Sequence, residues 1–437
     1  MPLGRPGTSK EREIVMECID TVVIGAGHAG LAVSRLLSAA GHEHVVLERG
    51  RVGERWRSER WDSLHLLTPN WMTRLPGFSY RGPDPDGYLA ADAFADHLDR
   101  YAASFDAPVV ERATVEDVSR AWPTRSYRVV TDKGTWRAAN IVVATGPHGT
   151  AHLAPAVRDG DLGPVDVVSA QRYRNPAQLR PGGVLVVGAS SSGVQIADEL
   201  ARAGRSVILS VGRHTRMPRR YRGMDIFWWL ESTGRLARTI DEMRDATAAR
   251  RETSLQLAGR NSPELFGQNL DLAVLQANGV RLAGRLVRVG GGRAWFSDDL
   301  GATVHAADRL MHRFLDAVDD YIRRSGLGRE VWEPVRPRPV ELPTRPLAWL
   351  NLSAEPISTI VLATGYRPHH PWLQLPVTAP DGSIEQYRGV TAAPGVYVVG
   401  QRFQHRRDSG FIDGARYDAG AVACHLLSRR TDTVQAA

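Results

Sequence analysis

Three glycines and one acid near the start of the chain have the residue types and spacing of a nucleotide site. Gly25, Gly27 and Gly30 form the pattern G-x-G-x-x-G, and Glu48 follows Gly30 by eighteen residues. Glycines allow a tight turn and a close approach of the backbone to a pyrophosphate, and a carboxylate at this distance can accept hydrogen bonds from a ribose. The spacing therefore predicts that this stretch binds a dinucleotide.

The elements that must position these residues are a strand, a helix and a second strand. Residues 18–24 have the pattern of a buried parallel strand that runs directly into the glycines. Apolar residues at helical spacing follow at 31–37, and Gly41 stands where this helix should end. Residues 44–47 form the next strand, which ends on Glu48. A structural turn without a ligand is the alternative, but the register of strand, glycines, helix, strand and acid favours the nucleotide.

A second glycine-rich turn occurs later in the chain. The strand at 184–187 leads into Gly188, Ser190 and Gly193, and a helix is expected at 194–203. Serine replaces the middle glycine, which is a small change that a close approach of the backbone tolerates. Two such turns in one chain suggest two nucleotide cofactors held face to face.

The residues after the next strand indicate which nucleotide the second turn binds. The strand at 206–210 ends without an acid and is followed by Arg213 and Arg216. An acid here would favour a free ribose 2′-hydroxyl, whereas arginine favours a 2′-phosphate. NADP is therefore predicted over NAD, although both arginines could instead be solvated surface residues.

Two further apolar strands each end in Ala-Thr-Gly, at 141–144 and 360–363. A proline-rich segment at 334–346 is expected to lead back to the first domain, so both strands are assigned to the first sheet. Residues 145–146 then lie beside the dinucleotide. Residues 409–414 open a last helix, whose N–H groups could stabilise negative charge on an electron-rich ring.

The other segments carry no assignable chemistry. A small antiparallel insertion is expected from strands at 109–116, 127–131 and 134–137, after a helix at 93–103. Residues 224–326 contain a helix at 306–324 but no motif.

Length and composition restrict the class of protein. A chain of 437 residues usually forms two or three domains. The net charge is +7, but only two of the 55 basic residues are lysines and the arginines are scattered, so no nucleic-acid surface is expected. A basic cleft for an anionic cofactor remains compatible with this charge.

The cysteine count and the hydropathy pattern restrict the class further. Cys18 and Cys424 are the only cysteines and no C-x-x-C occurs, so neither a redox dithiol nor a metal site is expected. Residues 1–13 do not resemble a signal peptide, and no run of about 18 apolar residues is present. We therefore expect a cytoplasmic protein without a membrane partner, and a homodimer is left open.

The ordered set of motifs resembles the class B flavoprotein monooxygenases. This set consists of G-x-G-x-x-G, Glu48, Trp56, Ala-Thr-Gly, G-x-S-x-x-G, Arg213 and the second Ala-Thr-Gly. It is closest to the bacterial CzcO-like branch, which is related to plant indole-pyruvate monooxygenases and to the flavin-containing monooxygenases. The resemblance extends over nearly the whole chain from about residue 17.

The resemblance implies an α/β fold with two Rossmann-like, three-layer ββα domains, the second inserted in the first. The implied division is a disordered tail at 1–16, an FAD-binding domain at 17–175 and 346–437, and an NADPH-binding domain at 176–345 with a helical insertion at about 224–330. In the family, NADPH reduces FAD, O₂ forms a C4a-(hydro)peroxyflavin, and a small organic molecule receives one oxygen atom.

The resemblance also implies roles for individual residues. The FAD adenosine half would be held by Gly25, Gly27, Gly30 and Glu48, and Trp56 would lie near the isoalloxazine. NADPH would be held by Gly188, Ser190, Gly193, Arg213 and Arg216, and the pyrimidine edge of the flavin would be met by Ser409, Gly410, Phe411 and Ile412. Further cofactor contacts are predicted at His28, Ala29, Arg49, Thr68, Thr145, Gly146, Ser191, Ser192, His214, Thr364, Gly365 and Gly400. The flavin carries the chemistry, and the catalytic candidates in the protein are Trp56, Ser169 and His405.

Two departures from the family pattern keep an alternative open. Ser169 occupies the histidine place of the linker motif, although Tyr173 keeps its aromatic place, and this weakens a Baeyer–Villiger assignment. Leu67 stands where animal flavin-containing monooxygenases have an asparagine close to the flavin. The alternative is an FAD-dependent NADPH oxidase or reductase that does not oxygenate its substrate.

Overall fold

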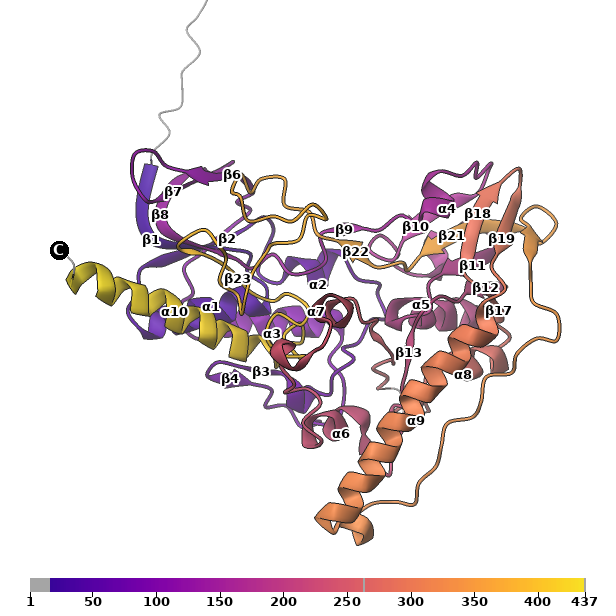
Figure 1. Ribbon diagram of the computed structural model, residues 1–437. Coiled ribbons are helices and arrows are strands. Elements are labelled where there is room, and N and C mark those ends of the chain that lie inside the picture. Colours follow the sequence, from indigo (N-terminus) through magenta and orange to yellow (C-terminus); the bar gives the residue numbers. More distant parts are fainter. Residues whose placement is uncertain (1–15, 262–263, 436–437) are drawn as a thin grey trace, which may run out of the picture.

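The chain folds into two lobes, each built on its own β-sheet. The computed structural model describes residues 16–261 and 264–435. The lobe with the first sheet is at the left of Figure 1 and the lobe with the second sheet is at the right. The disordered tail expected at 1–16 lies outside the described residues, apart from Met16, which begins the first strand.

The first sheet is mixed and contains the predicted unit of strand, turn, helix and strand. Its strands are β1 (Met16–Ile24), β2 (His44–Glu48), β5 (Val109–Glu111), β6 (Val115–Arg120), β7 (Tyr127–Thr131), β8 (Gly134–Val143) and β23 (Val396–Val398). The order is β5-β2-β1-β8-β7-β6, with β23 also paired to β8. Strands β5, β2, β1, β8 and β23 are joined by parallel pairings, whereas β6, β7 and β8 are antiparallel neighbours.

Two features of this sheet correct the prediction. β8 is one strand of ten residues rather than two, because it pairs with β1 from Thr135 to Val143. β5 belongs to the parallel part of the sheet, since Val109 is the register partner of Val46 on β2. The antiparallel extension therefore consists of β6, β7 and the adjoining part of β8.

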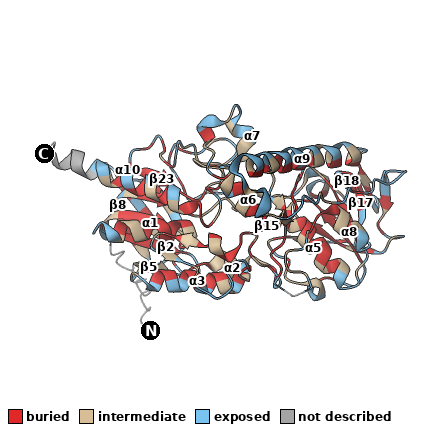
Figure 2. Cartoon of the chain, turned by 90° about the horizontal axis from the view of Figure 1, so that it is seen from below, coloured by how far each residue is buried: buried red, intermediate tan, exposed pale blue. Residues whose placement is uncertain are grey.

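Helices cover one face of the first sheet. They are α1 (His28–Ala39), α3 (Ala91–Ala103) and α10 (Ala415–Gln435), with the short α2 (Glu54–Ser58) close to α3. Leu31, Val33 and Leu37 of α1 are fully buried and pack in one cluster with side chains of α3 and α10. Figure 2 shows buried residues along α1 and the neighbouring strands, and also in the second lobe around α5. The helix ends before Gly41, whose φ of +62° suits the residue after a helix terminus.

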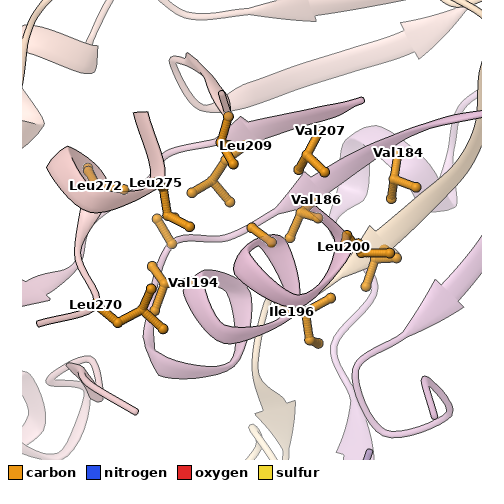
Figure 3. Close-up of a cluster of buried hydrophobic side chains, with 14 of the residues drawn as sticks. Val184, Val186, Val194, Ile196, Leu200, Val207, Leu209, Leu270, Leu272 and Leu275 are labelled. Atoms are coloured by element: carbon orange, nitrogen blue, oxygen red, sulfur yellow. The ribbon is translucent and has the colours of Figure 1, made fainter. Parts of the chain in front are cut away.

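The second sheet is entirely parallel. Its strands are β10 (Asp166–Ser169), β11 (Gly183–Val187), β12 (Val207–Ser210), β17 (Arg281–Ala283) and β21 (Ile357–Leu362), in the order β10-β21-β11-β12-β17. One face is covered by α5 (Ser191–Arg202) and α8 (Leu272–Ala277), and Figure 3 shows the core there, with Val186 and Leu209 of the sheet facing Val194 of α5. The other face is covered by α4 (Pro155–Arg158) and by the antiparallel strands β18 (Leu286–Gly290), β19 (Arg293–Phe296) and β20 (Trp349–Asn351).

The position of β21 corrects the prediction that the second Ala-Thr-Gly strand returns to the first sheet. Val361 of β21 lies beside Val186 of β11 and Val168 of β10, in the middle of the second sheet. Both neighbours are apolar parallel strands, so β21 is buried from both sides. The second sheet thus takes strands from 166–169 and from 357–362, on both sides of the range expected for it.

The chain crosses between the lobes at a pair of short strands. β9 (Thr150–Ala151) leads into the second lobe and β22 (Tyr366–Arg367) leads out of it, and the two are antiparallel partners. The N–H of His152 also donates to the carbonyl of Gly365 at 2.9 Å. The two chain segments that connect the lobes are therefore hydrogen-bonded to each other.

A long helix extends from the second lobe to a third apolar cluster. α9 (Leu300–Ser325) contains the helix predicted at 306–324 and ends at Gly326, whose φ is +70°. Met311 and Phe314 of α9 are buried in the same cluster as Phe227 and Trp229 of α6 (Ile226–Ser232). In Figure 1, α9 (orange) runs obliquely from the second lobe towards α6. The remaining short elements are β3 (Arg74–Leu75), β4 (Phe78–Ser79), β13 (Thr215–Arg216), β14 (Arg220–Tyr221), β15 (Met224–Asp225), β16 (Leu255–Gln256), α7 (Ala246–Arg250) and four 3₁₀ turns, at 70–72, 176–178, 240–242 and 327–329.

No helix within residues 16–261 and 264–435 is long and apolar enough to cross a membrane. No group of three or more His, Cys, Asp or Glu side chains in the same ranges is placed to hold a metal ion.

Candidate functional site

The first glycine-rich turn lies at the carboxyl end of β1, where α1 begins. Gly25 has a φ of +107°, a conformation that glycine adopts without strain. A Cβ on Gly30 would lie 2.0 Å from the carbonyl oxygen of Gly25, so only glycine lets α1 approach the strand this closely. At Gly27, by contrast, no atom of the described residues beyond its chain neighbours lies within 4 Å of the Cβ position. The turn is thus packed at two glycines and open at the third, as close approach of a phosphate requires.

Glu48 lies at the end of β2 and is bound to this turn. Its buried carboxylate accepts the N–H of Ala26 at 2.8 Å and the N–H of Gly50 at 3.0 Å, one on each oxygen. A carboxylate has about four acceptor positions, so two hydroxyl groups of a ribose could still be accepted. Arg49 is exposed and pairs with Glu59 at 2.5 Å.

The ends of β8 and β23 meet the same turn. A Cβ on Gly400, just after β23, would lie 3.0 Å from the Cβ of Ala29 in α1. The carbonyl oxygen of Ala144, just after β8, lies 2.8 Å from the Cβ position of Gly25. Residues 145–146 follow directly, so the predicted Thr-Gly pair lies at the edge of the sheet where the turn is open.

Three polar side chains at this edge have no hydrogen-bond partner within the described part of the chain. They are His28 (Nε2), Thr145 (Oγ1) and Gln401 (Nε2), and all three atoms are buried. Burial lowers the pKa of His28 to about 4, so its ring is neutral near pH 7. Buried polar groups are normally satisfied, and several orphans together indicate a missing polar ligand. The open turn, the acid and these orphans fit a dinucleotide.

A cationic cluster lies beside this edge, at the junction of the lobes. The guanidinium of Arg55 donates to the carbonyl of His148, whose ring contacts that of Tyr366 with centroids 4.7 Å apart. Burial holds the pKa of His148 well below its ordinary value, and the charges of Arg60, Arg55 and Arg402 lower it further. This cluster was not predicted from the sequence, although five arginines between residues 49 and 60 were a usable signal.

The second turn repeats the geometry of the first. Gly188 has a φ of +106°, its Cβ position lies 2.5 Å from the carbonyl oxygen of Ala363, and that of Gly193 lies 1.7 Å from the carbonyl oxygen of Gly188. Ala363 directly follows β21, so each glycine turn abuts the Ala-Thr-Gly of its own sheet. Thr364 and Gly365 therefore lie at the second turn.

The start of α5 leaves its backbone donors available. Ser190 precedes the helix but its side chain makes no capping hydrogen bond, and Ser191 and Ser192 form the first turn. The first N–H groups of a helix have no partner inside the helix and attract anions. This end of α5 can therefore receive a phosphate group.

Arg213 remains exposed after β12. Its guanidinium donates to the backbone carbonyl of Arg251 at 2.9 Å and forms no ion pair with a described residue. Most of its donors are therefore available to a phosphate at the carboxyl end of the second sheet.

The side chains of Arg216 and His214 are not available to a ligand, which corrects their predicted role as cofactor contacts. The guanidinium of Arg216 is fully buried and pairs with Asp271 and Asp308, each at 2.7 Å. His214 is also buried and its Nδ1 bonds to the carbonyl of Gly212 at 3.0 Å. Both side chains hold this lobe together instead of facing a ligand.

Trp56 lies where the two lobes meet. Its ring packs edge-on against Phe94, with centroids 4.9 Å apart, and the guanidinium of Arg60 lies 5.1 Å from its centroid. It contacts the apolar cores of both lobes. Thr68, on the loop that follows α2, is buried.

Ser169 lies at the end of β10 in the second sheet. Its carbonyl accepts the N–H groups of Arg172 and Tyr173, both at 2.9 Å. Tyr173 is fully buried and donates its hydroxyl to Glu199 of α5 at 2.7 Å. The aromatic position of the linker motif therefore fixes the linker to the second lobe.

The segment before α10 is a series of turns. The hydroxyl of Ser409 accepts the N–H groups of His405 and Arg406, at 3.2 and 2.9 Å. Phe411 meets Phe227 of α6 edge-on, with centroids 5.8 Å apart. Gly410 is exposed, Ile412 is buried, and the helix begins only at Ala415, which corrects the expected start. His405, Ser169 and Trp56 lie on three separate elements.

Comparisons with known proteins agree with this geometry. Residues 22–232 match the family described as pyridine nucleotide-disulphide oxidoreductase. An uncharacterized CzcO-like oxidoreductase of Geobacillus kaustophilus is 30% identical over 413 residues, which cover 94% of this chain and 99% of that protein. The rice indole-3-pyruvate monooxygenase YUCCA8 is 31% identical over 222 residues, covering 47% of this chain and 51% of that enzyme. The solved flavin-containing monooxygenase of Stenotrophomonas maltophilia has a TM-score of 0.63 at 19% identity, covering 95% of this chain and 99% of that one.

Proposed function

The chain belongs to the class B flavin monooxygenases, in the branch of CzcO-like oxidoreductases, and from this premise we propose that it uses NADPH and O₂ to insert one oxygen atom into a small organic molecule. Its cofactors are FAD and NADPH. The proposal rests above all on one observation. The chain carries two glycine turns of the same geometry, and each abuts its own Ala-Thr-Gly strand end.

We assign FAD to the first lobe. The open backbone at Gly27 would face the pyrophosphate, and Glu48 would accept the ribose hydroxyls. The orphaned polar atoms of His28, Thr145 and Gln401 would find partners on the cofactor. When bound, FAD supplies a ring that NADPH reduces and that passes electrons to O₂.

We assign NADPH to the second lobe, at Gly188, at the start of α5 and at Arg213. The exposed guanidinium of Arg213 would bind the 2′-phosphate, since it has no carboxylate partner among the described residues. The two domains would then divide at the paired strands β9 and β22, with residues 152–365 forming the inserted NADPH domain. This assignment revises the limits of 176 and 345 expected from the sequence.

The side chains at the lobe junction would position the two cofactors relative to each other. Trp56 packs against both cores, so it fixes the two lobes relative to each other at the place where the cofactor rings should meet. Burial, reinforced by the charges of the neighbouring arginines, lowers the pKa of His148 and keeps its imidazole neutral, so the ring can accept or donate a hydrogen bond but carries no charge.

The test is to measure where the oxygen goes. Purified protein should be yellow, and NADPH should bleach the flavin without air. With ¹⁸O₂, one labelled atom should enter a sulfide, amine, ketone or indolic acid, with one NADPH consumed per product. A colourless protein, or a flavin that NADPH does not reduce, would contradict the proposal.

An NADPH oxidase is the second candidate, and Leu67 is the residue that favours it. Its side chain packs in the apolar cluster with α6 and α9, and its backbone carbonyl accepts a hydrogen bond from Arg219 at 2.8 Å. Leu67 therefore offers no side-chain amide to the flavin. Release of one H₂O₂ per NADPH with every compound of the screen would favour this candidate, and Leu67→Asn should then lower the peroxide yield.

A further inference from the structure

A small cavity lies outside both nucleotide turns. It has a volume of about 260 Å³ and lies between the β14–β15 hairpin and the segment that follows α9. We refer to it as the arginine-lined cavity, and the residues that matter for its chemistry are Arg220, Arg222, Gly223, Trp332, Glu333 and Arg336. Sites for drug-sized ligands usually occupy 300–1,000 Å³, so a ligand here would be smaller than those.

The wall of the cavity carries more positive than negative charge. Three guanidinium groups line it, against the single carboxylate of Glu333. Arg336 pairs with Asp316 and Asp319 at 2.9 and 2.8 Å, and Arg222 meets Asp319 only at 3.5 Å. Arg220 forms no ion pair with a described residue. Its guanidinium lies over the ring of Phe266, 5.0 Å from the centroid.

Each of the three arginines also has a buried nitrogen without a hydrogen-bond acceptor. These atoms are Nε of Arg220, Nε of Arg222 and Nη1 of Arg336, and the acceptors considered are those of the described residues. Buried donors normally have partners, so the described residues leave part of the hydrogen-bonding capacity of these three guanidinium groups unmet. Guanidinium groups bind carboxylates through charge-assisted hydrogen bonds, often two in parallel.

An aromatic surface adjoins these charges. Trp332 lines the cavity, and this residue is 72% exposed. One side of the indole rests on Gly223, where a Cβ would lie 3.0 Å from the ring. Gly223 has a φ of +83°, so the turn itself requires glycine and thereby leaves room for the ring. A large indole kept in place yet mostly uncovered offers a face on which a flat ring can stack.

We propose that the arginine-lined cavity binds a small aromatic carboxylate, whose carboxylate faces Arg220 and its neighbours and whose ring packs on Trp332. This site is separate from the cofactor turns, and its existence does not depend on the proposed function. The neighbouring Arg219 does not line the cavity; it donates to the carbonyl of Leu67 and pairs with Asp225, so it connects the start of the β14–β15 hairpin to the loop after α2.

The test is calorimetric titration of the FAD-containing protein with sodium benzoate at constant ionic strength. Three comparison compounds each remove one feature: cyclohexanecarboxylate has no aromatic ring, benzamide has no charge, and inorganic phosphate has neither ring nor carboxylate. Benzoate should bind at one saturable site and more tightly than all three. Arg220→Ala removes the guanidinium that would bind the carboxylate of the ligand, so it should weaken benzoate binding at least about tenfold. Arg220→Lys keeps the charge and should weaken binding less.

Two variants locate the site and separate binding from folding. Trp332→Ala changes an exposed side chain, so the protein should fold normally and bind benzoate several times more weakly. Arg309→Ala removes an exposed arginine elsewhere on α9 and should change nothing. The proposal is overturned by any of three results: no saturable binding of benzoate, equal binding by all variants, or equal binding of phosphate independent of Trp332, which would mean an adventitious ion only.

Discussion

Replacement of Asp418 by asparagine should change how the stability of this protein depends on pH. Asp418 lies in the first turns of α10 and is 1% exposed. Neither carboxylate oxygen meets the geometry of a hydrogen bond. Burial raises its pKa to about 7; Asp408 adds to this effect, and Ser409 and Arg406 oppose it only in part. An amide of the same shape cannot ionise.

The sign and size of this pH effect on stability follow from the pKa of Asp418 in the folded and the unfolded state. An unfolded aspartate has a pKa of about 4, so the fold binds this proton more tightly than the unfolded chain does. Below about pH 4 the group contributes nothing. Between about pH 4 and 7 the unfolded state ionises first, and stability falls as the pH rises. Above pH 7 the loss is complete, and at about 1.4 kcal/mol per pKa unit it reaches about 4 kcal/mol.

The assay is urea unfolding of wild type and Asp418→Asn at several pH values between 4.5 and 8.5, with excess FAD. The two proteins should unfold at similar urea concentrations near pH 4.5, and the variant should be increasingly more stable towards pH 8. Asp86→Asn is the matched control, because Asp86 is exposed. If the difference between Asp418→Asn and wild type is the same at every pH, or grows towards acid, the carboxyl is not protonated in the fold.

Three further substitutions test the two nucleotide sites. Gly27→Val should abolish FAD retention while the protein still folds, because the added side chain meets open space in the protein; a yellow variant would contradict the site. Arg213→Ala should raise the KM for NADPH about tenfold or more and leave that for NADH nearly unchanged, and equal losses would refute a 2′-phosphate contact. Arg216→Ala should instead lower stability by about 3–5 kcal/mol, because it leaves the carboxylate of Asp271 buried without a charged partner. Retained stability together with a selective loss of NADPH affinity would restore the role predicted from the sequence.

The parts of the fold that the sequence predicted are those encoded by neighbouring residues. The strand at 18–24, the glycines, the helix and Glu48 lie within about thirty residues, and β1, α1 and β2 occupy these places. The same is true of β11, α5 and β12 around the second turn. Here hydrophobic period and glycine spacing specify local structure without reference to the rest of the chain.

The errors concern partners that lie far away in the sequence. An apolar strand that ends in Ala-Thr-Gly fits the middle of either sheet, so its own residues could not show that β21 pairs with β11. Arg216 has the pattern of a phosphate ligand until its partners are known, and these lie 55 and 92 residues further along. The arginine-lined cavity likewise joins two segments more than 100 residues apart.

The order in which the two lobes are completed during synthesis follows from the way the second lobe interrupts the first. β8 and α1 are synthesised early. Their partners, β23 and α10, are among the last segments to be synthesised. The second lobe, by contrast, has all five of its parallel strands once residue 362 has emerged. During synthesis the later lobe can thus close before the earlier one, and a nascent chain must keep the apolar side of α1 protected from aggregation until its C-terminal helix arrives.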